Sequence, residues 1–205
     1  EVKKQIEETD TTDFDAILSV SPYYNKPNQE GLYQHYKMLA ETGKQIIIYN
    51  VPGRTGQNIE ASTTLRLAKE FPNLFMIKEA APNILQYFDI IRNKPENFNL
   101  VSGDDEYTLP VTLAGGNGVI SVIGQGYPKE FSTMLNLAFD RKVDEAYVIH
   151  NKLVEITRLI FAEGNPVGIK YVLSQKGIIK NYLRLPLVPA SKSLEEKIKE
   201  QMATI

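Results

Sequence analysis

The sequence contains no cysteine and only two histidines in 205 residues. Without cysteine the chain can form neither a disulfide nor a catalytic thiolate, which fits a reducing compartment, and we expect a cytoplasmic protein. The histidines, His35 and His150, lie in predicted helices and lack the spacing of zinc ligands. We therefore expect no metal site.

The sequence also lacks a strong excess of either charge and any long apolar run. Its 23 Lys and Arg residues and 25 Asp and Glu residues leave a net charge of −2, which gives no reason to expect binding to nucleic acid or to an anionic membrane. No run is long enough to span a bilayer, and no signal-peptide pattern opens the sequence. The 42% hydrophobic and 23% charged residues are ordinary for a globular domain with a proper core.

Short apolar runs alternate with helical patterns over the first 123 residues. Strands are predicted at residues 16–21, 45–51, 74–80, 99–102 and 119–123. Helices are predicted at residues 1–9, 28–42, 60–71 and 82–94, with Asn28 as an N-cap, a loop at 52–56 and a short helix after Asp104. After Gly124 the pattern is helical only, at residues 128–139, 143–162, 166–175 and 194–202, the last with a capping box of Ser193 and Glu196.

Strands separated by helices predict parallel pairing with right-handed crossovers. Two architectures remain open: an open doubly wound sheet, and part of an eight-stranded barrel. No Gly-x-Gly-x-x-Gly motif follows the first strand, so the dinucleotide-binding form of the open sheet loses support. Polar residues end nearly every predicted strand, which favours the barrel, because barrel enzymes build their active sites at that rim.

We therefore expect an α/β protein that contains strands 4–8 of a (β/α)8 TIM barrel. Five strands cannot close such a barrel, and the sequence opens on a helical pattern. Three further βα units of roughly 30 residues each, about 90 in total, are expected upstream. We place the five strands in residues 1–127, and the last barrel helix with a C-terminal helical domain in residues 128–205.

The third predicted strand ends in a lysine, which is unusual in a buried run. Lys78 could extend past the strand end into water, as long amphipathic side chains do. Alternatively, it points into an active site and acts as an amine nucleophile, because desolvation favours the neutral amine. Strand alternation places Tyr49 on the face of Ile47 and Lys78 on the face of Met76, so both could point into a barrel.

The interpretation of Lys78 as a nucleophile is favoured by three residues near the ends of the first two strands: Tyr24, Tyr49 and Arg54. A Schiff-base enzyme needs a partly neutral amine, a group that relays protons and a cation for the substrate carboxylate. A tyrosine hydroxyl can relay protons, and an arginine can bind a carboxylate through two hydrogen bonds. Each residue alone is more commonly a packing or surface residue, and their joint occurrence carries the hypothesis. The acidic residues 104–106 could bind a divalent metal but are more simply a complement to a helix dipole.

Five motifs resemble, in order and spacing, the dihydrodipicolinate synthase (4-hydroxy-tetrahydrodipicolinate synthase) family of pyruvate-dependent lyases. They are PYYNKP at 22–27, YNVPGRTG at 49–56, IKEA at 77–80, SGDD at 102–105 and GGNGVIS at 115–121. Asn165, Pro166 and Lys170 resemble its C-terminal helical part. The resemblance implies a (β/α)8 barrel followed by helices, and a homotetramer built from tight dimers. It also implies condensation of pyruvate with aspartate 4-semialdehyde for lysine and diaminopimelate biosynthesis, with no cofactor.

The resemblance also implies roles for individual residues. Lys78 would form the imine with pyruvate, and Tyr49 would be the central proton relay. Tyr24 would belong to the same relay and reach the neighbouring subunit's site, while Arg54 would hold the carboxylate of the semialdehyde. The backbones of Gly103 and Ile120 would line the pyruvate site, and Tyr23 would lie near the dimer interface, where the family's lysine-inhibitor site lies.

The sequence departs from the family in two places. The first three strands, which carry a relay threonine, do not occur in it, so we expect residues 1–205 alone to have no useful activity. Ala81 and Pro82 replace the small hydroxyl residue and glycine that follow the family's lysine. Two alternatives remain: a related aldolase for sialic acid or keto-deoxy sugar acids, and a non-catalytic barrel remnant. The arginine in the 53–56 loop favours the synthase.

Overall fold

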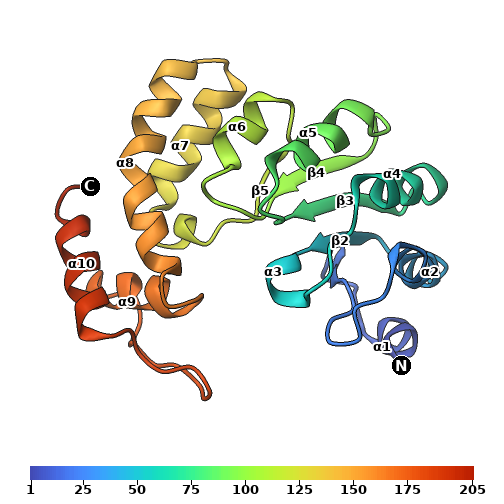
Figure 1. The fold of residues 1–205 in the computed structure, drawn as a ribbon, viewed down its shortest axis with the longest axis horizontal. Coiled ribbons are helices and arrows are strands. Elements are labelled where there is room, and N and C mark those ends of the chain that lie inside the picture. The colour runs from blue at the N-terminus through green and yellow to red at the C-terminus, as the bar shows by residue number, and fades with distance from the viewer. The chain divides into compact units, whose positions relative to one another are not determined.

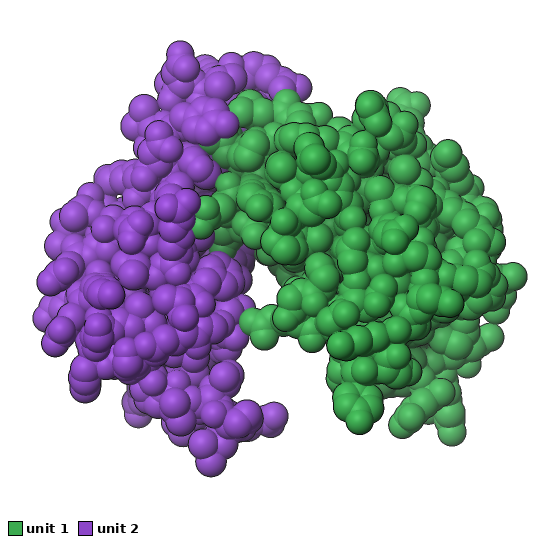
Figure 2. Space-filling view, in the orientation of Figure 1, with its two compact units in different colours: residues 1–120 green, residues 121–205 purple.

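The computed structural model describes residues 1–205, which divide into two units, residues 1–120 and 121–205 (Figure 2). The first unit contains all five strands, and the second is helical (Figure 1). No helix of the chain combines the length and the apolar character needed to cross a bilayer.

The first unit is built on one sheet in which every strand pairs with its neighbours in parallel. The spatial order equals the chain order: β1 (Ile17–Val20), β2 (Ile46–Asn50), β3 (Leu74–Glu79), β4 (Asn99–Ser102) and β5 (Gly118–Val119). The helices are α1 (Val2–Glu8), α2 (Gln29–Ala40), α3 (Pro52–Thr55), α4 (Ala61–Glu70), α5 (Ile84–Asn93) and α6 (Thr108–Leu113). The predicted parallel α/β arrangement is therefore confirmed.

Alternation along the strands gives the sheet two different faces. On one face, Ile46, Ile48 and Ile77 are fully buried in a core that α2, α4 and α5 complete. On the other face, Leu18 and Val20 of β1 are 45% and 37% exposed, although both are apolar. Because successive residues of a strand point to opposite sides, every second residue of β2 and β3 lies on this open face.

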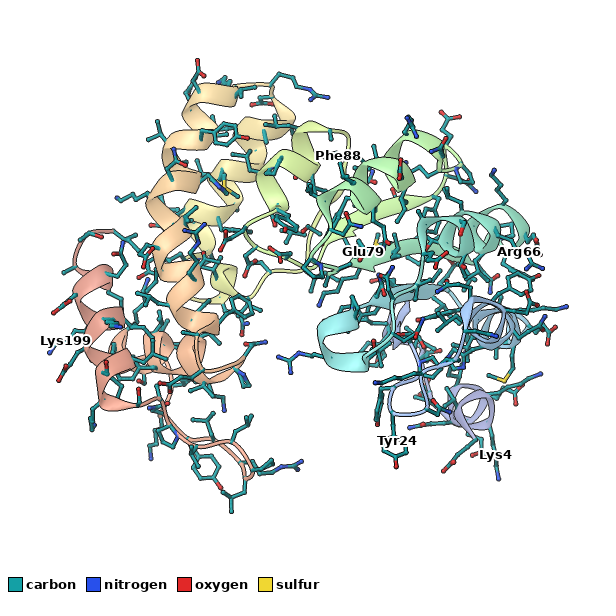
Figure 3. The ribbon with its side chains drawn as sticks, in the orientation of Figure 1. Lys4, Tyr24, Arg66, Glu79, Phe88 and Lys199 are labelled. Atoms are coloured by element: carbon teal, nitrogen blue, oxygen red, sulfur yellow. The ribbon has the colours of Figure 1, made fainter.

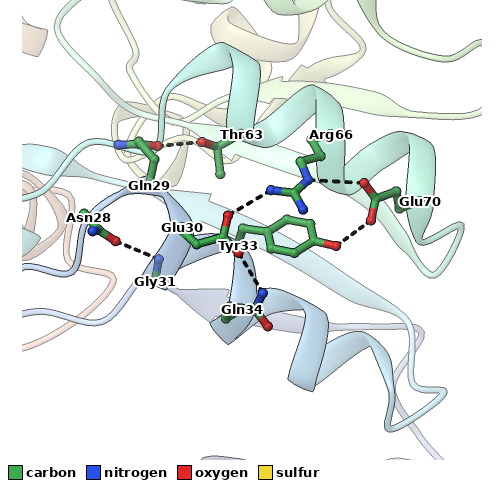
Figure 4. A network of polar contacts seen from close by, with 9 residues as sticks. All are labelled: Asn28, Gln29, Glu30, Gly31, Tyr33, Gln34, Thr63, Arg66 and Glu70. Carbon is green, nitrogen blue, oxygen red and sulfur yellow. Dashed lines mark hydrogen bonds and ion pairs between the residues drawn. The ribbon is translucent and has the colours of Figure 1, made fainter.

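The outer surface of the unit carries a polar network between α2 and α4 (Figure 4). Arg66 donates to Glu30 at 2.9 Å and to Glu70 at 3.2 Å, and its guanidinium carbon lies 3.4 Å from the centroid of the Tyr33 ring. The Tyr33 hydroxyl donates to Glu70 at 2.5 Å. Exposed charges of this kind are screened by salt, so the buried core contributes more to stability.

Two expectations for the first unit need correction. The loop at 52–56 contains a one-turn helix, α3, which ends where Gly56 adopts a left-handed conformation with φ of 72°. The fifth strand is shorter than residues 119–123. Val122 has helical torsions, and the Ser121 hydroxyl accepts a hydrogen bond from the Gly124 amide at 2.8 Å. This turn ends the pairing with β4 and leads into a short 3-10 helix, η1 (Ile123–Gln125).

The second unit begins with η1 and contains four helices. They are α7 (Pro128–Phe139), α8 (Val143–Phe161), α9 (Val167–Gln175) and α10 (Lys192–Met202). The predicted capping box of Ser193 and Glu196 is wrong, because Ser191 is the N-cap and its hydroxyl accepts from the Leu194 amide at 3.3 Å. The carboxylate of Glu163 hydrogen-bonds both the amide and the hydroxyl of Ser191, which fixes the helix start two residues earlier.

The contact between α8 and α9 depends on a glycine. A Cβ atom on Gly168 would lie 2.4 Å from the Ile160 Cα and 2.5 Å from the Ile160 carbonyl oxygen. Neither backbone atom can move without shifting α8, so only glycine allows this approach.

We predict that Gly168→Ala destabilises the protein by about 1–3 kcal/mol, the usual cost of forcing extra volume into a packed contact. Urea unfolding followed by circular dichroism measures the change. Gln175→Ala, at an exposed position of the same helix, serves as the control and should shift stability by less than about 0.5 kcal/mol. Equal effects of the two substitutions would contradict the proposed close contact.

Candidate active site

The open face of the sheet brings Lys78 and Tyr49 together. The two residues are register partners on β3 and β2. The Lys78 Nζ atom lies 4.2 Å from the centroid of the Tyr49 ring, and both side chains are half-buried. The Lys78 amine therefore lies beside the Tyr49 ring on the sheet. This geometry favours the active-site interpretation over extension into water.

Burial lowers the pKa of the Lys78 amine, and the negative charge of Asp105 opposes this shift. A lower pKa increases the neutral fraction of the amine near neutral pH, and only the neutral amine can attack a carbonyl carbon. The site therefore raises the neutral fraction of Lys78 above that of a solvent-exposed lysine.

Burial also raises the pKa of the Tyr49 hydroxyl, and the positive charge of Arg54 opposes that shift. Tyr49 therefore keeps its proton at neutral pH. Its hydroxyl can donate a proton to a hydroxyl group on a carbon attached to Lys78, so that water leaves. The Tyr49 oxygen can later take a proton back.

Gly103 leaves room for the lysine side chain. A Cβ atom on Gly103 would lie 2.8 Å from the Ala80 Cβ and 3.0 Å from the Lys78 Cε. The Gly103 amide donates to the Glu79 carbonyl at 2.6 Å, and the Ile120 amide donates to the Ser102 carbonyl at 2.9 Å. The backbones that follow β4 and β5 are thus fixed at the same end of the sheet as Lys78.

Arg54 lies on α3, directly after β2, and its side chain is exposed. Its charge acts on Tyr49, so the three residues Arg54, Tyr49 and Lys78 belong to one end of the sheet. A Cβ atom on Gly56 would lie 2.9 Å from the Lys26 Cε, which shows that the segment after β1 packs against the end of α3.

The two tyrosines that follow β1 are not brought to Lys78 in this chain. Tyr23 and Tyr24 are 66% and 93% exposed, and Tyr24 projects away from the sheet (Figure 3). Tyr24 and Lys26 both have positive φ angles, 69° and 45°. Such a conformation is costly for residues other than glycine, so the loop holds Tyr24 outward at the expense of backbone strain.

The acidic residues after β4 have separate roles. Asp104 accepts from the amides of Glu106 and Tyr107 at 2.9 and 3.2 Å, which caps the turn before α6. Asp105 is 5% exposed and acts on Lys78. The interpretation as helix-end residues therefore fits Asp104, while the effect of Asp105 on the lysine was not expected from the sequence. No group of three or more His, Cys, Asp and Glu side chains could hold a metal ion.

Sequence reasoning also missed the environment of Glu79. This carboxylate is fully buried on the helix-covered face and accepts hydrogen bonds from Asn50, Gln86 and the Ala81 amide. Burial raises its pKa to about 7. The alternation of side chains along the strand could have predicted the burial of Glu79. Glu79 must face away from Lys78, and it lies two residues after buried Ile77, on the same face.

Comparison with known proteins gives matches to an enzyme family. The sequence profile of the Dihydrodipicolinate synthetase family matches residues 4–205. A 4-hydroxy-tetrahydrodipicolinate synthase from Flavobacterium psychrophilum is 54% identical over 199 residues, which cover 95% of this chain and 68% of the relative.

Solved structures agree with this match. The dihydrodipicolinate synthase from Thermotoga maritima is 38% identical with a TM-score of 0.94, covering 98% of this chain and 70% of that one. The chloride-inhibited dihydrodipicolinate synthase from Acinetobacter baumannii, solved with pyruvate, is also 38% identical, with a TM-score of 0.89, covering 93% of this chain and 65% of that one. The chain spans about two thirds of the length of these relatives.

We predict that Asp105→Asn lowers the pKa of Lys78 further, because the substitution removes the negative charge that favours the protonated amine. The pH dependence of acylation by acetic anhydride, followed at Lys78 by peptide mass spectrometry, measures this pKa. Asp89→Asn removes the same charge from an exposed position on α5 and should leave it unchanged. A raised or unaltered pKa in Asp105→Asn would contradict the assigned effect of Asp105.

Proposed function

Because the chain belongs to the Dihydrodipicolinate synthetase family, we propose that the protein condenses pyruvate with aspartate 4-semialdehyde to 4-hydroxy-tetrahydrodipicolinate. This reaction serves lysine and diaminopimelate biosynthesis. The observation that carries the proposal is the half-buried Lys78 amine, with a lowered pKa, 4.2 Å from the Tyr49 ring centroid. An amine in this state can form a Schiff base with a keto acid, so no further cofactor is needed.

The reaction begins when the neutral Lys78 amine attacks the keto carbon of pyruvate. Tyr49 donates a proton to the resulting hydroxyl, water leaves, and the imine forms. The Tyr49 oxygen then takes a proton from the methyl carbon, which gives an enamine. The enamine carbon bonds to the aldehyde carbon of the semialdehyde, and the proton passes to the former aldehyde oxygen, which becomes a hydroxyl. The amino group of the semialdehyde next attacks the imine carbon and closes the ring, and the C–N bond to Lys78 breaks, which returns the free amine.

The remaining residues bind and position the substrates. Arg54 holds the carboxylate of aspartate 4-semialdehyde, which its exposed position at the end of β2 supports. The backbones of Gly103 and Ile120 line the pyruvate site. The relative that was solved with pyruvate supports this substrate.

Assembly into a homotetramer, a dimer of tight dimers, is part of the proposal. Tyr24 completes the proton relay of the neighbouring subunit, and Tyr23 lies near the interface, where a regulatory ligand would bind. The outward, strained conformation of Tyr24 supports this arrangement, because a fully exposed tyrosine gains nothing from backbone strain within its own chain.

The proposal also includes a closed (β/α)8 barrel in which β1 to β5 are strands 4–8. The edge positions of β1 and β5 and the uncovered apolar residues Leu18 and Val20 support this arrangement. In a closed barrel both edges would be paired and this face would line the interior. The helices of residues 128–205 would then supply the last barrel helix and a C-terminal helical domain.

The names of the relatives favour the synthase over an aldolase for sugar acids and over a non-catalytic remnant. A substrate panel distinguishes the three. The synthase consumes aspartate 4-semialdehyde, an aldolase cleaves sialic acid or a keto-deoxy sugar acid, and a remnant acts on none of them.

We predict that borohydride reduction in the presence of pyruvate attaches a three-carbon acid to Lys78 of the intact protein. Peptide mass spectrometry identifies the modified residue, and Lys78→Arg is the control, because arginine cannot form the imine. Labelling at another lysine, or no labelling of the wild-type protein, would refute Lys78 as the nucleophile.

We further predict that, in the intact protein, Tyr49→Phe lowers kcat by about 10²- to 10⁴-fold, the usual contribution of a proton-transfer group. The aromatic ring remains beside Lys78, so only the hydroxyl is lost. A coupled assay with both substrates measures kcat. Tyr33→Phe removes a hydroxyl that donates to Glu70 between α2 and α4 and should leave kcat within about twofold of the wild type. Wild-type turnover in Tyr49→Phe would exclude the tyrosine as the relay.

A further inference from the structure

We infer that Glu79 is a positioning residue that fixes the Lys78 end of β3 to the loop that carries Arg54. It thereby sets where the second substrate's carboxylate lies relative to the imine. The inference rests on the proposed function, because it assumes that Lys78 and Arg54 bind the two substrates.

The Glu79 carboxylate is held by three neutral donors from three segments. Its oxygens accept from the Asn50 side chain at 2.8 and 3.1 Å, from the Ala81 amide at 2.7 Å and from the Gln86 side chain at 2.9 Å. Asn50 ends β2, Ala81 follows β3, and Gln86 lies in the first turn of α5. One carboxylate therefore joins two strand ends and a helix.

The same amides close the base of the Arg54 loop. The Asn50 side chain donates to the Asn58 Oδ1 at 2.8 Å and accepts from the Ile59 amide at 2.9 Å. The Gln86 side chain donates to the Ile59 carbonyl at 3.1 Å and accepts from Asn58 at 2.9 Å. Residues 51–57, which include Arg54, thus lie between Asn50, which contacts Glu79, and Asn58, whose side chain Asn50 and Gln86 hold.

An ionised carboxylate suits this position better than any other side chain of its size. All of its protein partners are N–H donors, and an ionised carboxylate only accepts. A glutamine would turn an NH2 group toward one of these donors and break that contact. Burial raises the pKa of Glu79 to about 7, and the hydrogen bonds from Gln86, the Ala81 amide and Asn50 oppose this rise. The three donors therefore favour the ionised form of the carboxylate.

Glu79 does not touch the reacting atoms. It follows Lys78 directly, so its side chain lies on the opposite face of the sheet. Its effect must pass through the positions of the strand ends and the loop. A displacement of about 1 Å is enough to reduce productive binding severely.

The test compares Glu79→Gln with the wild type in the intact protein. We expect KM for aspartate 4-semialdehyde to rise by about 10- to 100-fold, because a misplacement of about 1 Å can cost about 100-fold. Pyruvate trapping at Lys78 by borohydride should remain at the wild-type extent. Thr64→Val, which changes a buried side chain of α4 outside this network, is the matched control and should leave both readouts unchanged.

A double substitution separates positioning from general damage. If Glu79 acts through the Arg54 loop, Glu79→Gln has no further effect on this KM in an Arg54→Ala background, because the coupled contributions are not additive. A full additional rise, or an unchanged KM in Glu79→Gln alone, would overturn the inference. Failure of the wild-type protein to trap pyruvate would instead refute the proposed function.

Should Glu79→Gln fail to fold, Gln86→Leu tests the same network while keeping Glu79. It removes one donor from the carboxylate and one from the Ile59 carbonyl. We expect the same selective rise in KM for the semialdehyde, and an unchanged KM would overturn the inference.

Discussion

The parallel register between β2 and β3 is the constraint on which the site depends. It sets Tyr49 opposite Lys78 and Asn50 opposite Glu79. Because side chains alternate, the first pair lies on the open face and the second lies under the helices. A slip of one residue would bury the lysine and expose the carboxylate. The hydrophobic core under α2, α4 and α5, which holds Ile46, Ile48 and Ile77, therefore also fixes the chemistry of the opposite face.

The same alternation keeps two opposite charges apart. Lys78 and Glu79 are adjacent in sequence, and a contact between them would stabilise the protonated amine. On opposite faces, the lysine loses solvation and its pKa falls, while neutral donors satisfy the carboxylate. The charge that does act on Lys78 is Asp105, which limits the fall in pKa. The pKa of the Lys78 amine thus depends first on the face of the sheet on which it lies, and then on the carboxylate of Asp105.

The features that depend on periodicity could be predicted from the sequence. Parallel strands, their helices, and Tyr49 and Lys78 on one face all follow from patterns of two and 3.6 residues. Features that depend on a single tertiary hydrogen bond could not. Ser191 rather than Ser193 caps α10 because Glu163, 28 residues away, hydrogen-bonds it. β5 ends early because Ser121 turns the chain. The effect of Asp105 on Lys78 likewise requires the fold of the segment after β4.

Glu79 is held both through its backbone and through its side chain. Its backbone carbonyl accepts from the Tyr87 hydroxyl at 2.7 Å and from the Gly103 amide at 2.6 Å, while its side chain holds Asn50. A side chain on Gly103 would press on both Ala80 and Lys78, and would strain the hydrogen bond to Glu79. Gly103 therefore provides both the space around the Lys78 amine and a hydrogen bond that holds the end of β3. Glu79, the residue after Lys78, is therefore fixed through its backbone carbonyl on one side and its carboxylate on the other.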